Sequence, residues 1–186
     1  MNIKITYKRQ VLGKPKENLL LFVDEKFNIQ SLKKHISSSE YFFILDLIKI
    51  KDEKKKIISF DISSKRKIIL VSLTKNLSSS GAENLGAECY DFFKEIKSTE
   101  YVINTNCISD NLKNLIGYFL HGIKLKSYKF EKYKTKKNKK DIILIVSGKN
   151  IPVEKQRVRF NAIEQGTFYT RDLVSEPGNV LHPDEY

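Results

Sequence analysis

The sequence has little that could carry metal or thiol chemistry. Only two cysteines are present, Cys89 and Cys107, and neither has a second cysteine or a histidine at the spacing typical of a zinc site. The three histidines, His35, His121 and His182, form no HExxH or HxH motif. We therefore predict no catalytic residue and no metal ligand in this chain, and we expect Cys89 to be a small core residue.

Long apolar runs and a secretion signal are also missing. The longest apolar runs, at residues 19–23 and 68–71, are far shorter than the about 20 residues that cross a bilayer. Residues 1–7 contain no apolar stretch followed by a small-residue cleavage site. We expect a soluble, cytoplasmic protein with no membrane partner and no disulfide bond.

Glycine-rich phosphate-binding motifs are absent too. Residues 72–81 follow a predicted strand and precede a predicted helix, which is the context in which helix amides bind anions. This segment contains neither GxGxxG nor GxxxxGKS/T. We interpret it as an ordinary loop in which Ser78, Ser79 or Ser80 caps the following helix.

The sequence does contain a regular alternation of strand and helix patterns. Strands are predicted at residues 2–7, 19–24, 57–62, 67–73, 101–104 and 141–146, and helices at 29–36, 82–96, 109–123 and 153–175. Residues 41–50 fit a buried helix or strand equally well, and a hairpin is one arrangement of the first two strands. The alternation predicts an α/β fold, a mostly parallel or mixed sheet covered by helices, over residues 1–150.

The last residues resemble the start of a further structural element. Pro177 and Gly178 end the predicted helix, and residues 182–185 resemble the first turn of another, with Pro183 at the first helical position. A single helical turn is not stable in water. We therefore interpret residues 151–186 as a linker helix and the beginning of another domain, and the chain as a fragment.

Two motifs resemble the leucyl aminopeptidases, also called cytosol aminopeptidases. Residues 171–183, Arg-Asp-Leu-Val followed by Glu-Pro-Gly-Asn-Val-Leu-His-Pro, are similar to the joint between the two domains of that family. Residues 122–134 resemble its GxxLxxYxFDxYK run, with Glu131 where aspartate is usual. The motifs stand in the family's order, so the chain resembles the amino-terminal domain with the start of the inter-domain joint.

The resemblance implies a macro-domain-like fold and a parent enzyme. Such a parent would be a bacterial cytosolic exopeptidase, a hexamer that uses two divalent ions, zinc or manganese, to release amino-terminal residues from peptides. The family's metal-binding run, Asn-Thr-Asp-Ala-Glu-Gly-Arg, does not occur here. We expect this chain to be inactive alone, to support assembly or active-site access, and to have the missing catalytic domain as its partner.

The polar residues of the last predicted helix leave two interpretations open. Arginines and carboxylates at helical neighbour spacings could form surface ion pairs, or they could contact the missing half. Leu173, Val174, Val180 and Leu181 would then be apolar residues left uncovered. The charged residues are Arg157, Arg159, Arg171, Glu154, Glu164 and Asp172.

A lysine cluster suggests a different class of function. The net charge is +12, and six lysines lie beside or after the aromatic residues Tyr128, Phe130 and Tyr133: Lys132, Lys134, Lys136, Lys137, Lys139 and Lys140. Cations beside aromatic residues are typical of nucleic-acid surfaces, so a stand-alone basic module that binds DNA or RNA is the alternative. The plainer interpretation is a solvated loop whose aromatic residues pack on the body.

Salt dependence distinguishes these interpretations. If the cluster binds nucleic acid, affinity should fall steeply as salt rises, with the slope of log K against log salt changing by about 0.9 for each phosphate contact. The combined changes Lys136→Gln, Lys137→Gln, Lys139→Gln and Lys140→Gln should then abolish binding, measured by fluorescence anisotropy. Unchanged affinity in this variant would refute the alternative.

Overall fold

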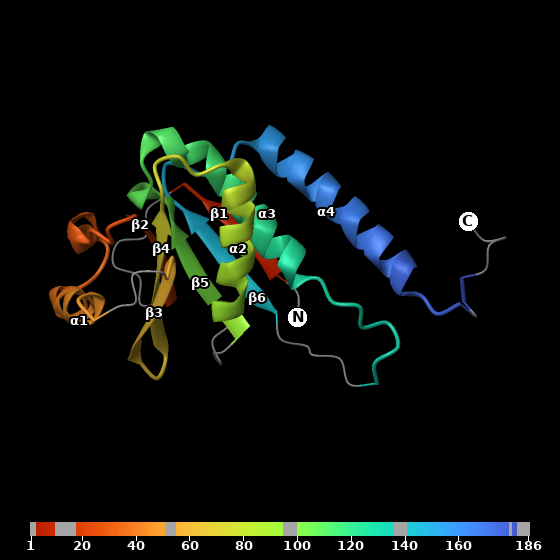
Figure 1. Cartoon of the computed structure of the whole chain (residues 1–186), viewed down its shortest axis with the longest axis horizontal. Helices are drawn as coiled ribbons and strands as arrows, with labels where there is room; N and C mark the ends of the chain where they lie inside the picture. Colours follow the sequence, from red (N-terminus) through yellow and green to blue (C-terminus); the bar gives the residue numbers. More distant parts are fainter. Residues whose placement is uncertain are drawn as a thin grey trace.

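The protein is a mixed six-stranded sheet between helices (Figure 1). The computed structural model describes residues 3–9, 18–50, 55–94, 100–135, 141–178 and 180–181. The strands are β1 (Ile3–Lys8), β2 (Asn18–Asp24), β3 (Ile57–Ser63), β4 (Arg66–Leu73), β5 (Glu100–Asn104) and β6 (Ile142–Ser147). The predicted α/β class is confirmed.

The order of strands in the sheet is β1-β6-β5-β2-β4-β3, and every neighbouring pair is parallel except β3 with β4. The hairpin considered for the first two strands is wrong. β1 pairs with β6 at one edge, whereas β2 lies in the centre between β4 and β5. Residues 18–23 of β2 are all buried, which requires a neighbour on every side and excludes an edge position.

Alternating side chains of β2 contribute to two cores. Leu19, Leu21 and Val23 face the 3-10 helix η1 (Gln30–Lys34) and α1 (Ser38–Ile48) on one side of the sheet. Most of the ambiguous stretch 41–50 belongs to α1 and is helical. Ser37 caps the start of α1 with a capping box, because Ser37 Oγ accepts from Glu40 N and Ser37 N donates to Glu40 Oε2.

The opposite side is covered by α2 (Ser79–Lys94) and α3 (Ile116–Ser127). Ser78 Oγ caps α2 by accepting from Gly81 N at 3.0 Å, which confirms the predicted serine cap. Cys89 is fully buried in this core, as predicted. The helix predicted from residue 109 differs at its start. Two short 3-10 helices, η2 (Thr105–Cys107) and η3 (Asp110–Leu115), precede the α-helical part.

Helices α2 and α3 touch backbone to backbone. A Cβ atom at Gly122 would lie 1.9 Å from the carbonyl oxygen of Glu83, and one at Gly86 would lie 2.0 Å from that of Phe119. Only glycine fits at either position. This explains why a glycine begins the motif at residues 122–134.

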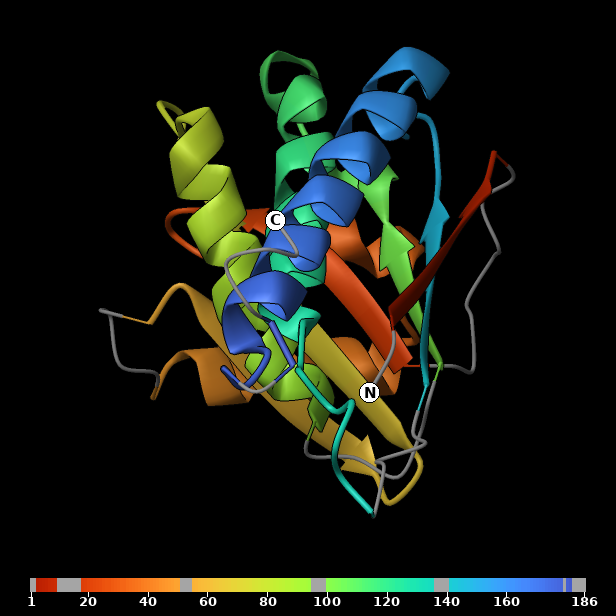
Figure 2. The same ribbon diagram turned by 90° about the vertical axis from the view of Figure 1, so that its right-hand side faces the viewer.

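The last helix, α4 (Glu154–Ser175), forms an outer layer against α3 (Figure 2). Of its residues, Phe160 and Glu164 are buried. Its carboxyl-terminal half projects beyond the sheet (Figure 1). In the described part of the chain, no helix combines the length and apolar composition of a membrane span.

We predict opposite outcomes for two glycine-to-alanine changes. Gly122→Ala should lower the free energy of unfolding by about 2 kcal/mol or more, because the methyl group forces the α2 and α3 backbones apart. The control, Gly166→Ala, has nothing within 4 Å of the added Cβ. It should stabilise α4 by about 0.5–1 kcal/mol. Urea unfolding measures both, and equal stabilities for Gly122→Ala and the parent would contradict the proposed contact.

Candidate functional site

The two sequence motifs meet at the carboxyl end of α4. The Tyr128 ring stacks on Phe168 with 5.4 Å between ring centres, and Tyr128 Oη donates to Asp172 Oδ1 at 2.8 Å. Arg171 Nη1 donates to the carbonyl oxygen of Leu125 at 2.8 Å. We call this contact region the clasp, formed by Leu125, Tyr128, Lys132 and Tyr133 with Phe168, Arg171, Asp172 and Glu176.

Glu176 completes the clasp directly after the last turn of α4. Lys132 Nζ donates to its Oε1 at 2.6 Å, and Tyr133 Oη donates to its Oε2. The Glu176 side chain is only 9% exposed as a result. The hydrogen bonds from Lys132 and Tyr133 lower the pKa of Glu176, and the bond to Glu176 raises the pKa of Lys132.

A second attachment joins the middle of α4 to α3. His121 Nδ1 and Glu164 Oε1 are 2.9 Å apart, and the His121 ring stacks on Phe160. His121 is therefore a buried, hydrogen-bonded residue. Burial raises the pKa of Glu164, although His121 acts in the opposite direction. Surface pairing, one of the two interpretations of the charged residues of this helix, is wrong for Glu164, because Phe160 and Phe168 flank it at helical spacing on the packed face.

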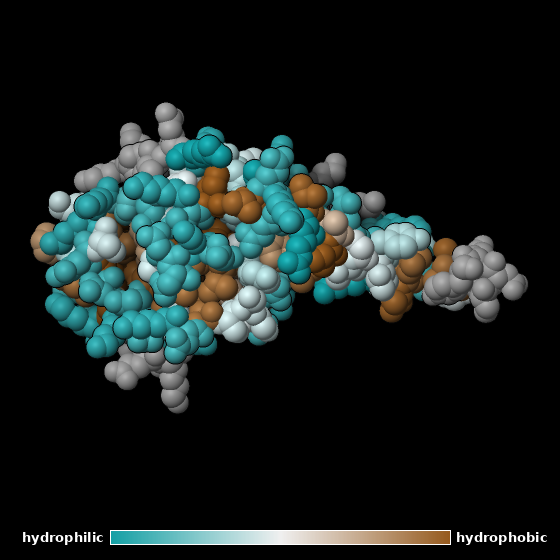
Figure 3. Space-filling view, turned by 90° about the horizontal axis from the view of Figure 1, so that it is seen from above, coloured by the Kyte–Doolittle hydropathy of each residue, from teal (hydrophilic) through white to brown (hydrophobic). Residues whose placement is uncertain are grey.

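Two of the three arginines of α4 make other contacts within the domain. The Arg157 guanidinium lies 4.7 Å from the centre of the Tyr7 ring, and Arg171 belongs to the clasp. Arg159 is exposed. Of the apolar residues expected to be uncovered, Val174 and Val180 are exposed, whereas Leu173 and Leu181 are half-buried. The surface over α4 carries apolar patches among hydrophilic ones (Figure 3).

Only part of the lysine cluster can be placed. Lys132 and Lys134 are exposed in a non-helical segment, and Lys136, Lys137, Lys139 and Lys140 lie outside the described residues. The charge of Lys132 is directed at Glu176, and its Nζ lies 5.5 Å from the centre of the Tyr133 ring. Nucleic-acid binding through this cluster therefore stays a prediction.

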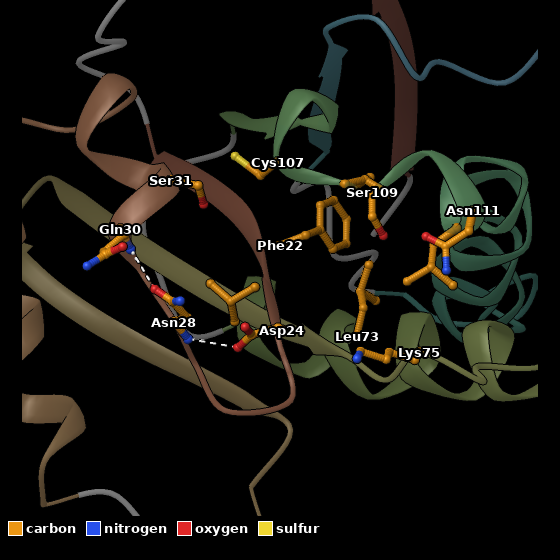
Figure 4. A pocket seen from close by; sticks show the side chains of 13 residues that line it. Phe22, Asp24, Asn28, Gln30, Ser31, Leu73, Lys75, Cys107, Ser109 and Asn111 are labelled. Atoms are coloured by element: carbon orange, nitrogen blue, oxygen red, sulfur yellow. Dashed lines mark hydrogen bonds between the residues drawn. The ribbon is translucent and has the colours of Figure 1, made fainter.

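A recess of about 530 Å³ opens at the carboxyl ends of β2 and β4 (Figure 4). Parallel α/β sheets bind ligands at this edge. The polar lining includes Asn28, Ser109 and Lys75, while Asp24 Oδ1 already accepts from the backbone N–H groups of Lys26 and Asn28. The recess could hold a small polar molecule by hydrogen bonds.

The recess also contains Cys107, but not as a nucleophile. Burial raises the pKa of its thiol to about 12, so the reactive thiolate is not formed near neutral pH. Among the described residues, His35 Nδ1 lies 3.0 Å from Asn104 Nδ2, and His121 binds Glu164. Within the described ranges, no three His, Cys, Asp or Glu side chains are grouped to hold a metal ion.

We predict that Glu176→Gln loosens the end of α4. Loss of the charge bound by Lys132 should raise amide hydrogen exchange at residues 171–175 by about fivefold, because that turn would open locally more often. Glu154→Gln, at the exposed start of the same helix, is the matched control and should leave these amides unchanged. Equal exchange in Glu176→Gln and the parent would contradict the clasp.

The same contact should depend on pH. Because the folded pKa of Glu176 is lowered, its stabilising effect is complete above the ordinary value of 4.5 and is lost as pH falls through the folded pKa. Protection of residues 171–175, corrected for intrinsic exchange, should therefore decrease below pH 4.5. Protection in Glu176→Gln should not show this decrease.

Comparisons with known proteins agree with the two motifs. A "Probable cytosol aminopeptidase" from Rhizobium meliloti (strain 1021) is 38% identical over 76 residues, 37% of this chain and 15% of that protein. Another from Ehrlichia ruminantium (strain Gardel) is 31% identical over 130 residues, 64% of this chain and 25% of that protein. The chain thus spans a quarter or less of the length of these curated relatives. No family model matches it.

Solved structures show the same fold. A mutant of tomato leucine aminopeptidase aligns with a TM-score of 0.75 at 18% identity, covering 99% of this chain and 40% of that one. The bottromycin maturation enzyme BotP, in complex with Mn, aligns with a TM-score of 0.63 at 9% identity, covering 92% of this chain and 34% of that one. The predicted resemblance to the leucyl aminopeptidases is therefore confirmed in sequence and in fold, and it is consistent with an amino-terminal domain of that family.

Proposed function

We propose that this chain is the amino-terminal, non-catalytic domain of a bacterial cytosolic leucyl aminopeptidase. The observation that carries the proposal is the clasp, because it is built from both sequence motifs that resemble this family. Tyr128, Lys132 and Tyr133 come from the first motif, and Arg171, Asp172 and Glu176 come from the second. The clasp holds the segment that joins the two domains in that family.

The role of such a domain is positional. α4 has 22 residues and is therefore about 33 Å long, and it is attached at its middle by His121–Glu164 and at its end by the clasp. Two attachment points along one helix define its direction. The domain would thereby hold the catalytic half in place, support a hexamer and control access to the active site.

Catalysis would lie outside the 186 residues. The parent would be a two-metal exopeptidase in which zinc or manganese activates the water that attacks the first peptide bond. The described residues do not fit these ions, since no suitable group of ligands is present among them. The relatives are also several times longer than their matched segments.

We predict no hydrolysis of leucyl amide by this chain, with or without added manganese. Release of leucine should equal the blank at every protein concentration, because the residues that bind the ions are not in the chain. A metal-loaded cytosol aminopeptidase provides the positive control. Turnover that remains constant through successive purification steps would refute the assignment of the chemistry to another part of the protein.

A second experiment tests the parent directly. Sequencing the encoding locus downstream of the Tyr186 codon should show an in-frame continuation containing a run similar to Asn-Thr-Asp-Ala-Glu-Gly-Arg. In that longer protein, Glu176→Gln should lower peptidase activity while the metal content stays unchanged. An immediate stop codon would contradict the proposal of an active parent enzyme.

A further inference from the structure

A groove of about 1050 Å³ lies between β1, α3 and α4, and it shares no lining residue with the recess of Figure 4. Ile5 of β1, Leu120 of α3, and Phe160 and Phe168 of α4 give the groove apolar walls. β1 is the last strand at its edge of the sheet, next to β6 (Figure 2). The groove therefore combines apolar walls with an edge of the sheet.

The backbone of β1 is available along this edge. The carbonyl oxygen of Lys8 accepts from Gly148 N, directly after β6, at 3.2 Å, so the backbone groups of Lys8 point toward β6. Backbone groups of successive strand residues point to opposite sides, and those of Ile5 and Tyr7 therefore point away from β6. In the described part of the chain, no strand pairs with that side of β1. An edge of this kind can accept an extended peptide as an additional strand.

Arg157 supplies a cation at one end of the groove. Its guanidinium lies 4.7 Å from the centre of the Tyr7 ring, and its Nε is buried with no hydrogen-bond partner among the described residues. A buried donor without an acceptor costs free energy. A carboxylate bound beside Tyr7 would supply that acceptor, and a guanidinium binds a carboxylate through two parallel hydrogen bonds.

The Tyr7 hydroxyl is a second donor at the same end. Burial raises the pKa of Tyr7, so the hydroxyl keeps its proton at neutral pH. Tyr7 is the residue before the last of β1, and it lines the groove. Arg157 and Tyr7 thus place two donors for a carboxylate at the carboxyl end of this edge strand.

The charges around the groove do not suit a polyanion. The lining residues include three with cationic side chains, and three carboxylates would repel a phosphate chain. A single carboxylate on an otherwise uncharged ligand avoids most of this repulsion. The charged lining residues are Lys4, Lys124, Arg157, Asp141, Glu154 and Glu164.

We propose that the groove binds the carboxyl-terminal end of an extended apolar peptide. The peptide runs parallel to β1, its main chain bonds to the backbone of Ile5 and Tyr7, and its terminal carboxylate binds Arg157 and the Tyr7 hydroxyl. Alternate side chains of the peptide contact the apolar walls. From Ile3 to Tyr7 the edge is about 13 Å long, which suits four or five peptide residues. This binding needs no peptidase activity and no contact of the clasp.

Fluorescence anisotropy of the full chain tests the proposal. The probe is the peptide Leu-Ser-Leu-Ser-Leu with fluorescein on its amino terminus and a free carboxyl terminus, titrated with protein up to about 1 mM. The same peptide with an amidated carboxyl terminus is the matched control. It should bind about tenfold or more weakly, because it lacks the charge that Arg157 binds.

Substitutions locate the site on the protein. Arg157→Gln should raise the Kd of the free-acid peptide by about tenfold or more, and Tyr7→Phe by about threefold or more. Arg159→Gln, an exposed position on the same helix, should leave the Kd unchanged. In Arg157→Gln the free-acid and amidated peptides should bind equally, which a merely structural role of Arg157 would not produce. Circular dichroism checks that each variant is folded.

Backbone methylation tests the pairing with β1. Methyl groups on the amide nitrogens of the leucines or of the serines block one of the two alternating sets of peptide N–H groups. Only one set can face β1, so one methylated peptide should lose binding and the other should keep it.

The remaining results would overturn the proposal. Absence of binding at the highest concentration, or equal affinity of the parent for the free-acid and amidated peptides, would contradict it. If sodium phosphate displaces the peptide and both methylated peptides bind normally, the site takes simple anions only and the proposal fails. None of these measurements involves hydrolysis or Glu176, so the proposed function would stand or fall separately.

Discussion

The close crossing of α2 and α3 is the constraint on which the outer part of the molecule depends. Because Gly86 and Gly122 have no side chains, the backbones of α2 and α3 are in direct contact. α3 in turn carries His121 and Leu125, and Tyr128 follows its last turn, so α3 and the residue after it supply partners for both attachments of α4. A larger residue at either glycine would displace α3 and move both attachment points together. The glycine of the sequence motif is thus a packing requirement, and it acts on the clasp through the position of a whole helix.

The two attachments of α4 have different physical characters. His121–Glu164 is buried, so removal of one partner would leave the other without a hydrogen bond in a poorly hydrated place. In Lys132–Glu176 the Lys132 side chain is 58% exposed, so water screens its charge and the gain from pairing is modest. The inner contact therefore holds the helix against the domain, and the outer contact sets the path of the chain after residue 175. This division suits a domain whose function is to position another one.

Particular residues show how far the sequence could be interpreted alone. The capping serine and the buried Cys89 followed from local spacing, since each depends on neighbours within one or two helical turns. The two aminopeptidase-like motifs were identifiable, but nothing in them indicated that Tyr128 binds Asp172 or that Lys132 binds Glu176, 44 residues away in both cases. The lysine cluster was interpreted from its composition alone. The structure shows that one of these lysines, Lys132, binds the carboxylate of Glu176. Glu164 was misplaced because a buried carboxylate and a surface one look identical in a sequence.

The sequence by itself determined the α/β class, the succession of strands and most helices, and the resemblance to the leucyl aminopeptidases. These follow from hydrophobic periodicity, capping residues and short motifs, all of which act over a few neighbouring positions. Only the tertiary structure decided the strand order, the central place of β2 and the meeting of the two motifs. It also decided that α1 is helical with an apolar side left exposed. These features depend on contacts between residues far apart in the chain, where many pairings are compatible with the same local pattern and only the packing of the whole domain selects one.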